Sequence, residues 1–289
     1  MSAAGEANGK RATLLIGAPF IYAAAMLVVP IFTIITFSFW TQNYLDIDKS
    51  FTWANYVAAW SEPIYTTLMW RSLGISAVVT FFTVMLAYPL AYYISFHVPQ
   101  ERKTLWLFLI TIPFWTSYLL RVFAWKIMLG YNGVLNSGLI GLGIIDEPIR
   151  AMLYNVNAVV ITLTHAWGPF AILPIFVSLE KIDRSLINAA RDLGDAAWRR
   201  FYRVILPLSM PGVIAALLIV FIPTVGDYIT PGLVGGKDGV MIANMIRLQV
   251  SKANNWPLGA ALAVNAMIIV AILSVTMVVC LRTFIKRIR

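Results

Sequence analysis

The residues that could do chemistry in this 289-residue chain stand in two places. The first is a charged stretch, NAARDLGDAAWRRFYRVILPL, which runs from Asn188 to Leu208 in a sequence with 60% hydrophobic and only 12% charged residues. The second is a set of polar and aromatic residues inside or beside long apolar runs: Asp227, Tyr228, Trp115, Tyr118 and His165. Because polar groups are costly among apolar runs, these five are candidates for a solute path.

Each of the five also has an ordinary structural interpretation. The Asp227 carboxylate either meets a passing ammonium group or is solvated as a loop acid. His165 is the only ionisable side chain in its run, where an isolated histidine more often packs and hydrogen-bonds than carries protons. The aromatic residues suit the membrane interface, and a few would give cation–π contacts to an ammonium ion. Both interpretations stay open.

The elements that must position these residues are six runs, each long enough for a bilayer crossing of about 20 residues. They cover residues 14–40, 72–96, 104–129, 151–179, 204–226 and 257–281. Lipid offers no partners to backbone groups, and the runs lack the alternation of strands, so we expect six helices. The predicted fold is an all-α membrane protein, with a membrane domain over 14–284 after a polar tail over 1–13.

The distribution of positive charge predicts the orientation. With the N-terminus inside, the inside segments hold 14 of the 22 lysines and arginines. The positive-inside rule therefore places both termini in the cytoplasm. The outward segments carry more acids than bases, which suits a cationic solute. Topology accounts for the net charge of +9, so the excess of basic residues requires no nucleic acid partner.

Several other chemistries are excluded. The single cysteine, Cys280, allows no internal disulfide and no thiolate cluster, and we expect no metal site. The run GLVGGKDG fails as a phosphate loop, because Pro231 replaces the first glycine and Asp238 replaces the required Ser or Thr. His165 alone is not a catalytic pair, so a membrane-embedded enzyme is disfavoured. We expect no enzyme activity and no cofactor in this chain.

The charged stretch belongs to the longest inside segment, the loop over 181–203. Small or apolar residues recur in it near i, i+4 and i+8, which predicts one face of a helix. That face consists of Ala189, Ala190, Leu193, Gly194 and Ala197. Ser185 is the expected N-cap, with Asn188 at the capping-box position. Such a face suits docking into a partner, although a helix lying on the membrane surface has the same pattern.

This stretch resembles the cytoplasmic EAA loop of ATP-binding-cassette (ABC) importer permeases. That motif has two alanines, three residues, a glycine, nine residues and a hydrophobic-x-Leu-Pro ending, here Ala189, Ala190, Gly194 and Val204 to Pro207. Asn188 stands where the family usually has Glu, which predicts a weaker cap. Other segments resemble the first permease subunit of spermidine/putrescine importers: RSLGIS (71–76), PFWTSYLLRVFAWKIMLG (113–130), NGVLN (132–136), FIPTVGDYITPGLVGG (221–236) and NNWP (254–257).

The resemblance implies a six-helix type I ABC importer permease fold in a bacterial inner membrane, with a coupling helix between helices four and five. The residues expected to receive the motion of an ATPase are Asn188, Ala189, Ala190, Leu193, Gly194, Ala197 and Pro207. The implied partners are a second permease subunit, an ATPase dimer that binds ATP and magnesium, a periplasmic solute-binding protein and membrane lipid.

The cargo that the resemblance implies is a polyamine, with an opine or another small organic solute as the alternative. A self-contained secondary transporter is a rival of a different class. It would have more acids within the membrane and an inverted internal repeat, and the sequence has neither feature.

Overall fold

The computed structural model describes residues 3–44 and 46–288, and the side chains of residues 17, 19–44 and 46–283. Helices dominate it, as predicted. They are α1 (Ala3–Ser38), α2 (Ala54–Ser61), α3 (Pro63–Phe96), α4 (Gln100–Thr111), α5 (Tyr118–Leu129), α6 (Val134–Gly141), α7 (Val156–Glu180), α8 (Arg184–Asp192), α9 (Ala197–Arg200), α10 (Leu206–Val225), α11 (Ile229–Val234), α12 (Ile242–Ser251) and α13 (Trp256–Ile288). A small hairpin pairs β1 (Thr41–Asn43) with β2 (Asp46–Asp48).

Five stretches of helix are long and apolar enough to cross a membrane. They are Pro19–Ser38, Pro63–Phe96, Val156–Glu180, Ala197–Val225 and Trp256–Thr283. A sixth crossing is reached if the bent pair Gln100–Trp115 and Tyr118–Gly141 is one span. The all-α membrane fold predicted from the sequence is therefore the observed one.

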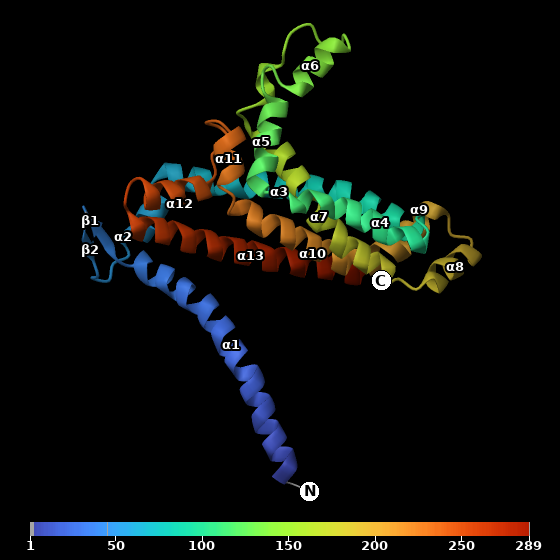
Figure 1. The fold of residues 1–289 in the computed structure, drawn as a ribbon, viewed down its shortest axis with the longest axis horizontal. Coiled ribbons are helices and arrows are strands. Elements are labelled where there is room, and N and C mark those ends of the chain that lie inside the picture. Colours follow the sequence, from blue (N-terminus) through green and yellow to red (C-terminus); the bar gives the residue numbers. More distant parts are fainter. Residues whose placement is uncertain (1–2, 45, 289) are drawn as a thin grey trace.

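The third predicted span, 104–129, is not a single helix. α4 ends at Thr111, a 3₁₀ turn covers Ile112–Trp115, and the helices on either side meet at an angle of 86°. Pro113 lies in this turn and supplies no backbone donor, and Thr116 then takes an extended conformation. α5 consequently leads away from the bundle toward α6 (Figure 1).

The second and fifth spans also begin earlier than the apolar runs indicate. α3 begins at Pro63 and continues through Arg71. The predicted run began after Arg71 because this charged residue interrupts the apolar sequence, although it does not interrupt the helix. The fifth span begins at Ala197 and includes a π-helical turn over Phe201–Ile205 before α10. Charged residues are tolerated at both places because they lie near the ends of the spans.

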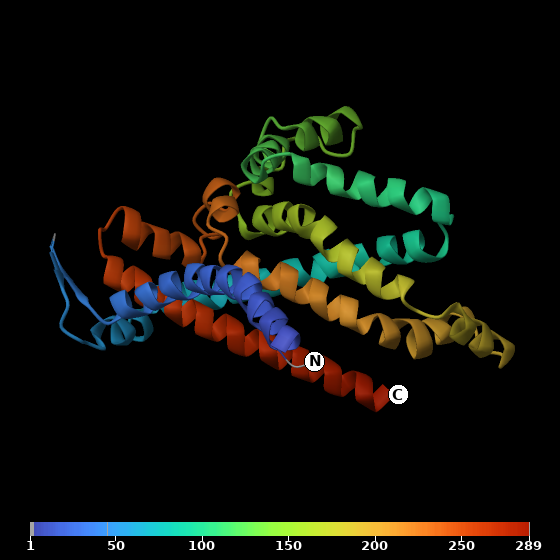
Figure 2. The same ribbon diagram turned by 60° about the horizontal axis from the view of Figure 1, so that its bottom comes forward.

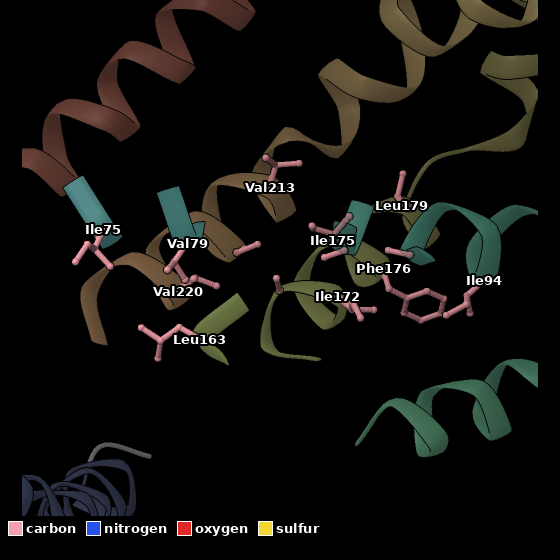
Figure 3. Packing of buried hydrophobic residues seen from close by; sticks show 14 of the residues in the cluster. Ile75, Val79, Ile94, Leu163, Ile172, Ile175, Phe176, Leu179, Val213 and Val220 are labelled. Carbon is pink, nitrogen blue, oxygen red and sulfur yellow. The ribbon is translucent and has the colours of Figure 1, made fainter. Parts of the chain in front are cut away.

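The centre of the bundle is formed by α3, α7 and α10, which run side by side (Figures 1 and 2). Figure 3 shows their buried aliphatic side chains meeting between the helices, with Val79 of α3, Leu163 and Ile175 of α7 and Val220 of α10 fully buried. At Gly212 of α10, a Cβ atom would collide with the Pro174 carbonyl oxygen. The backbones of α7 and α10 are therefore in direct contact there.

α13 packs beside α10, whereas α1 diverges from the bundle (Figure 1). Along its apolar stretch Pro19–Ser38, the rest of the chain buries Ser38 alone. Its last turn approaches the start of α13, where the rings of Phe37 and Trp256 lie 6.4 Å apart. We use "loop end" for the end of the bundle that carries α8 and α9, and "α12 end" for the opposite one (Figure 1).

Candidate functional site

The N-terminus of α8 is capped by Asp183, and the predicted Ser185 cap is wrong. The Asp183 carboxylate accepts a hydrogen bond from the Ser185 backbone N–H at 2.9 Å. This bond holds the pKa of the Asp183 carboxyl below its ordinary value. The negative charge of the Asp183 carboxylate is also favourable at a helix N-terminus, which carries partial positive charge. Asn188 lies in the middle of α8, so the expectation that it weakens the cap is also wrong.

The C-terminus of α8 depends on Gly194. Its φ of +85° lies in the left-handed region, which costs other L-residues about 1–2 kcal/mol. The Gly194 N–H donates to the Arg191 carbonyl at 2.9 Å, and the Asp195 N–H donates to the Ala190 carbonyl at 3.0 Å. These two bonds form a Schellman motif, which satisfies carbonyls that a helix end otherwise leaves unpaired. The glycine thus has a conformational role in the chain itself.

The predicted single face of the loop is divided in the structure. Ile187 packs against the bundle core. A stripe of α8, which we define as Leu186, Ala189 and Leu193, is exposed to solvent, and Leu193 is 88% exposed. Its i, i+3, i+7 spacing places the three residues along one side of the helix.

The remaining predicted coupling residues lie elsewhere. Ala190 is half-buried on α8, and Ala197 belongs to α9, after the turn at Gly194. Pro207 is buried in the first turn of α10, directly after the π-helical turn, and it has no backbone N–H to donate back into that turn. Pro207 is therefore packed inside the bundle, whereas Trp198 of α9 is 63% exposed beside the stripe.

The loop end also contains an ion-pair group that was not predicted from the sequence. We define the Glu180 cluster as Ser95, Lys103, Glu180 and Arg184. One carboxylate oxygen, Glu180 Oε1, accepts hydrogen bonds from Ser95 Oγ at 2.6 Å, Lys103 Nζ at 2.7 Å and Arg184 Nη2 at 3.3 Å. The available signal was the i, i+4 spacing of Glu180 and Arg184, which is typical of helical ion pairs.

At the α12 end, the structure brings together two of the predicted path residues, Asp227 and Tyr118. The Tyr118 hydroxyl donates to Asp227 Oδ2 at 2.6 Å and also lies 2.6 Å from the Thr230 hydroxyl. Asp227 Oδ1 accepts from the backbone N–H groups of Ile229 at 2.8 Å and Thr230 at 3.4 Å. Asp227 is only 8% exposed, so it is not a solvated loop acid. Its carboxylate ties α5 to the start of α11.

Tyr228, Trp115 and His165 are not gathered with this pair into one pocket. Tyr228 is 41% exposed, and the guanidinium carbon of Arg247 lies 5.1 Å from its ring centre. Trp115 is 80% exposed at the break between α4 and α5. His165 Nδ1 accepts a hydrogen bond from the indole N–H of Trp125 at 3.1 Å, which leaves its proton on Nε2.

His165 lies beside open space. It lines a groove of about 890 Å³ whose walls come from α3, α4, α5 and α7. The groove is largely apolar, and Thr83, Asn157 and Thr164 are among its few polar residues. Its position between membrane helices gives His165 access to a solute or a neighbouring helix, which the buried Asp227 lacks.

Comparison with known proteins gives concordant results. Residues 75–289 match the family model described as "Binding-protein-dependent transport system inner membrane component". The chain is 35% identical over 267 residues to the spermidine/putrescine transport system permease protein PotB of Haemophilus influenzae, covering 92% of each chain. It is 37% identical over 246 residues to PotB of Escherichia coli K12, covering 85% of this chain and 88% of that one.

Among solved structures, the fold resembles a chain of a bacterial ABC transporter involved in the import of the acidic polysaccharide alginate. The TM-score is 0.70 at 14% sequence identity, and 96% of each chain is covered. At this identity the similarity concerns the fold alone.

Proposed function

The chain belongs to the family of binding-protein-dependent transport system inner membrane components, and from this membership we propose that it is the permease subunit of an ABC importer for polyamines. The observation that carries the proposal is the 35–37% identity to two PotB proteins over most of the chain. Spermidine and putrescine are therefore the proposed cargo.

The proposed coupling site is the exposed stripe on α8, together with Trp198. A permease without a nucleotide motif of its own needs a separate ATPase, which binds ATP and magnesium. The stripe supports docking because Leu193, 88% exposed, would lose apolar contact with water inside a partner groove. The loop end is then cytoplasmic, both termini lie on that side, and the chain spans the bacterial inner membrane several times.

For the solute path, we assign different roles to the predicted residues. Trp115 presents an exposed aromatic face that suits an ammonium group, whereas the ring of Tyr228 already has the Arg247 guanidinium beside it. Asp227 and Tyr118 hold α5 against α11, so they position this region and do not bind the solute directly. His165 lines the groove, where a second permease subunit would close the open side. A periplasmic binding protein would deliver the solute at the α12 end.

The test is uptake of labelled spermidine, putrescine and an opine into proteoliposomes that contain this chain, its second permease and its ATPase, with binding protein added. ATP is supplied on the ATPase side. The controls omit ATP or the binding protein, or add a protonophore that collapses ion gradients. We expect uptake of a polyamine that requires both ATP and the binding protein and that resists the protonophore.

Each other outcome changes a specific part of the proposal. Uptake of the opine alone would support an ATP-driven importer and would replace the polyamine with an opine as its solute. Uptake that persists without ATP and stops with the protonophore would identify a secondary transporter and contradict the proposal.

A further inference from the structure

We propose that the Glu180 cluster is the joint through which α8 moves the membrane helices, with Glu180 as the positioning residue. The inference rests on the proposed function, because it concerns how ATPase-driven movement of α8 reaches the path. The exposed stripe accounts for contact with the ATPase, but it does not explain how movement of α8 is transmitted to the helices of the bundle. Transmission requires a link from α8 to helices that run through the membrane.

The cluster connects four helices through one carboxylate oxygen. Glu180 is the last residue of α7, and its Oε1 atom binds Ser95 at the end of α3, Lys103 in the first turns of α4 and Arg184 at the start of α8. Displacement of α8 therefore acts on α3, α4 and α7 at the same point. Two of these helices, α3 and α7, belong to the centre of the bundle, and α3, α4 and α7 also line the groove beside His165.

Arg184 is held to α3 by more than its ion pair. Its Nη2 atom donates to the Ser95 backbone carbonyl at 3.0 Å, and its guanidinium carbon lies 3.9 Å from the ring centre of Phe96. The Ser95 carbonyl is in the last turn of α3, where carbonyls lack helical partners and a positive charge is favourable. Arg184 thus joins the first residue of α8 to the terminus of α3.

Lys103 makes the joint resistant to separation. Its side chain is only 10% exposed, and Glu180 is its ion-pair partner among the described residues. Moving Glu180 away would leave a buried ammonium without a counter-ion, which is strongly unfavourable. α4 must therefore follow α7 when α8 moves.

Other ion pairs of the loop do not have this arrangement. Asp195 pairs with Arg199 at 3.5 Å and Arg203 at 3.7 Å, and all three residues belong to the segment between α8 and α10. Of the ion pairs in the described part of the chain, those of Glu180 are the ones that connect α7 with both α4 and α8, and its hydrogen bond from Ser95 adds α3.

The experiment compares wild type, Glu180→Gln and Glu101→Gln in the reconstituted transporter. Glu101 is an exposed acid in the first turn of α4. Glu101→Gln serves as the matched control, because this substitution removes one carboxylate two positions before Lys103 and leaves the Glu180 cluster unchanged. Three quantities are measured: ATPase co-purification, ATP hydrolysis stimulated by solute-loaded binding protein, and solute imported per ATP hydrolysed. The last ratio reports coupling and does not depend on the yield of folded protein.

For Glu180→Gln we expect normal ATPase co-purification and at least a tenfold fall in solute imported per ATP, with Glu101→Gln unchanged. Glu180→Asp, which keeps the charge, should recover part of the ratio. If Glu180→Gln does not fold, the double variant Lys103→Gln/Glu180→Gln removes the unpaired buried charge and gives the same comparison.

An unchanged ratio in a folded Glu180 variant would overturn the inference while leaving the proposed function intact. If wild type itself imports nothing with ATP, the proposed function fails, and the inference fails with it.

Discussion

Asp183, Glu180 and Asp227 all lie at helix ends, and the chain uses each carboxylate differently. Asp183 caps α8 and is fully exposed to solvent. Glu180 joins the ends of three helices to α8, and Asp227 accepts hydrogen bonds from Tyr118 and the start of α11. The common cause is that helix ends leave backbone groups unpaired and carry partial charge, so a nearby acid finds partners there.

Leu193→Asp should weaken ATPase docking without disturbing the fold. The side chain is 88% exposed, so the substitution changes little inside the chain. Docking would lose the burial of a leucine, about 1.5–3 kcal/mol, which corresponds to roughly a 10- to 150-fold weaker Kd. The measurement is the ATPase affinity of the purified permease complex. Leu142→Asp, 76% exposed in the loop after α6, is the matched control. Equal affinities for both variants would contradict the docking site.

Tyr118→Phe should destabilise the chain without affecting ATPase docking. The change removes the hydroxyl that donates to Asp227 Oδ2 and leaves a largely buried carboxylate with one partner fewer, at a cost of about 1–3 kcal/mol. We expect a lower thermal unfolding midpoint in detergent. Tyr131→Phe, at a tyrosine 46% exposed, should leave the midpoint unchanged. A wild-type midpoint for Tyr118→Phe would show that the Tyr118–Asp227 bond contributes no stability.

At the scale of elements, the breaks matter more than the long helices. The turn around Pro113 redirects the third span by 86°, and the Schellman motif at Gly194 separates α8 from α9. Each break is produced by local backbone chemistry, a missing N–H in one case and a left-handed residue in the other. These breaks affect which residues are exposed. The chain turns at Gly194, directly after Leu193, and Leu193 is left exposed at the end of α8.

Gly194→Ala should weaken ATPase affinity through strain in the loop. Alanine at a φ of +85° costs about 1–2 kcal/mol relative to glycine, so we expect an affinity loss of roughly 5- to 30-fold as α8 loses its ending. Gly194→Asn should lose less, because asparagine tolerates this conformation. As a control for strain alone, Gly143→Ala lies at a φ of +68° near α6 and should not change the affinity. Equal affinity for Gly194→Ala and Gly194→Asn would refute the conformational role.

For the whole molecule, hydropathy and charge predicted the membrane fold, because crossing a bilayer imposes a length and a composition on each span. They did not predict the break at Pro113, because membrane helices often accommodate proline without breaking. The Glu180 cluster also escaped prediction. It joins residues from separate helices, up to 89 positions apart between Ser95 and Arg184, and no local pattern records such a contact.

The positive-inside distribution leads to a labelling prediction. After replacement of Cys280, the single native cysteine, one cysteine is introduced at Leu142 or at Leu193. Both positions are well exposed, and in the predicted topology residue 142 falls in the outward segment between the third and fourth spans and residue 193 in the inside loop. In spheroplasts, a membrane-impermeant maleimide should label position 142 and not position 193. The reason is that 14 of the 22 basic residues fall on the inside in the predicted topology, which places residue 193 in the cytoplasm. Labelling at position 193 alone would show the opposite orientation and contradict the predicted topology.

The π-helical turn over Phe201–Ile205 bears on how this region tolerates insertions and deletions. Hydrogen bonds in a π turn span one residue more than in an α turn, so the segment contains one residue more than a regular helix would need. Each residue of an α-helix advances the chain by about 100° around the axis. A residue inserted or deleted between Trp198 and Phe201 would therefore rotate Trp198 by more than a quarter turn relative to α10, whereas deletion of the extra residue in the π turn would leave a regular helix. Point substitutions do not change the rotational position of Trp198 relative to α10. Related sequences are therefore expected to differ in this segment by substitutions and not by its length.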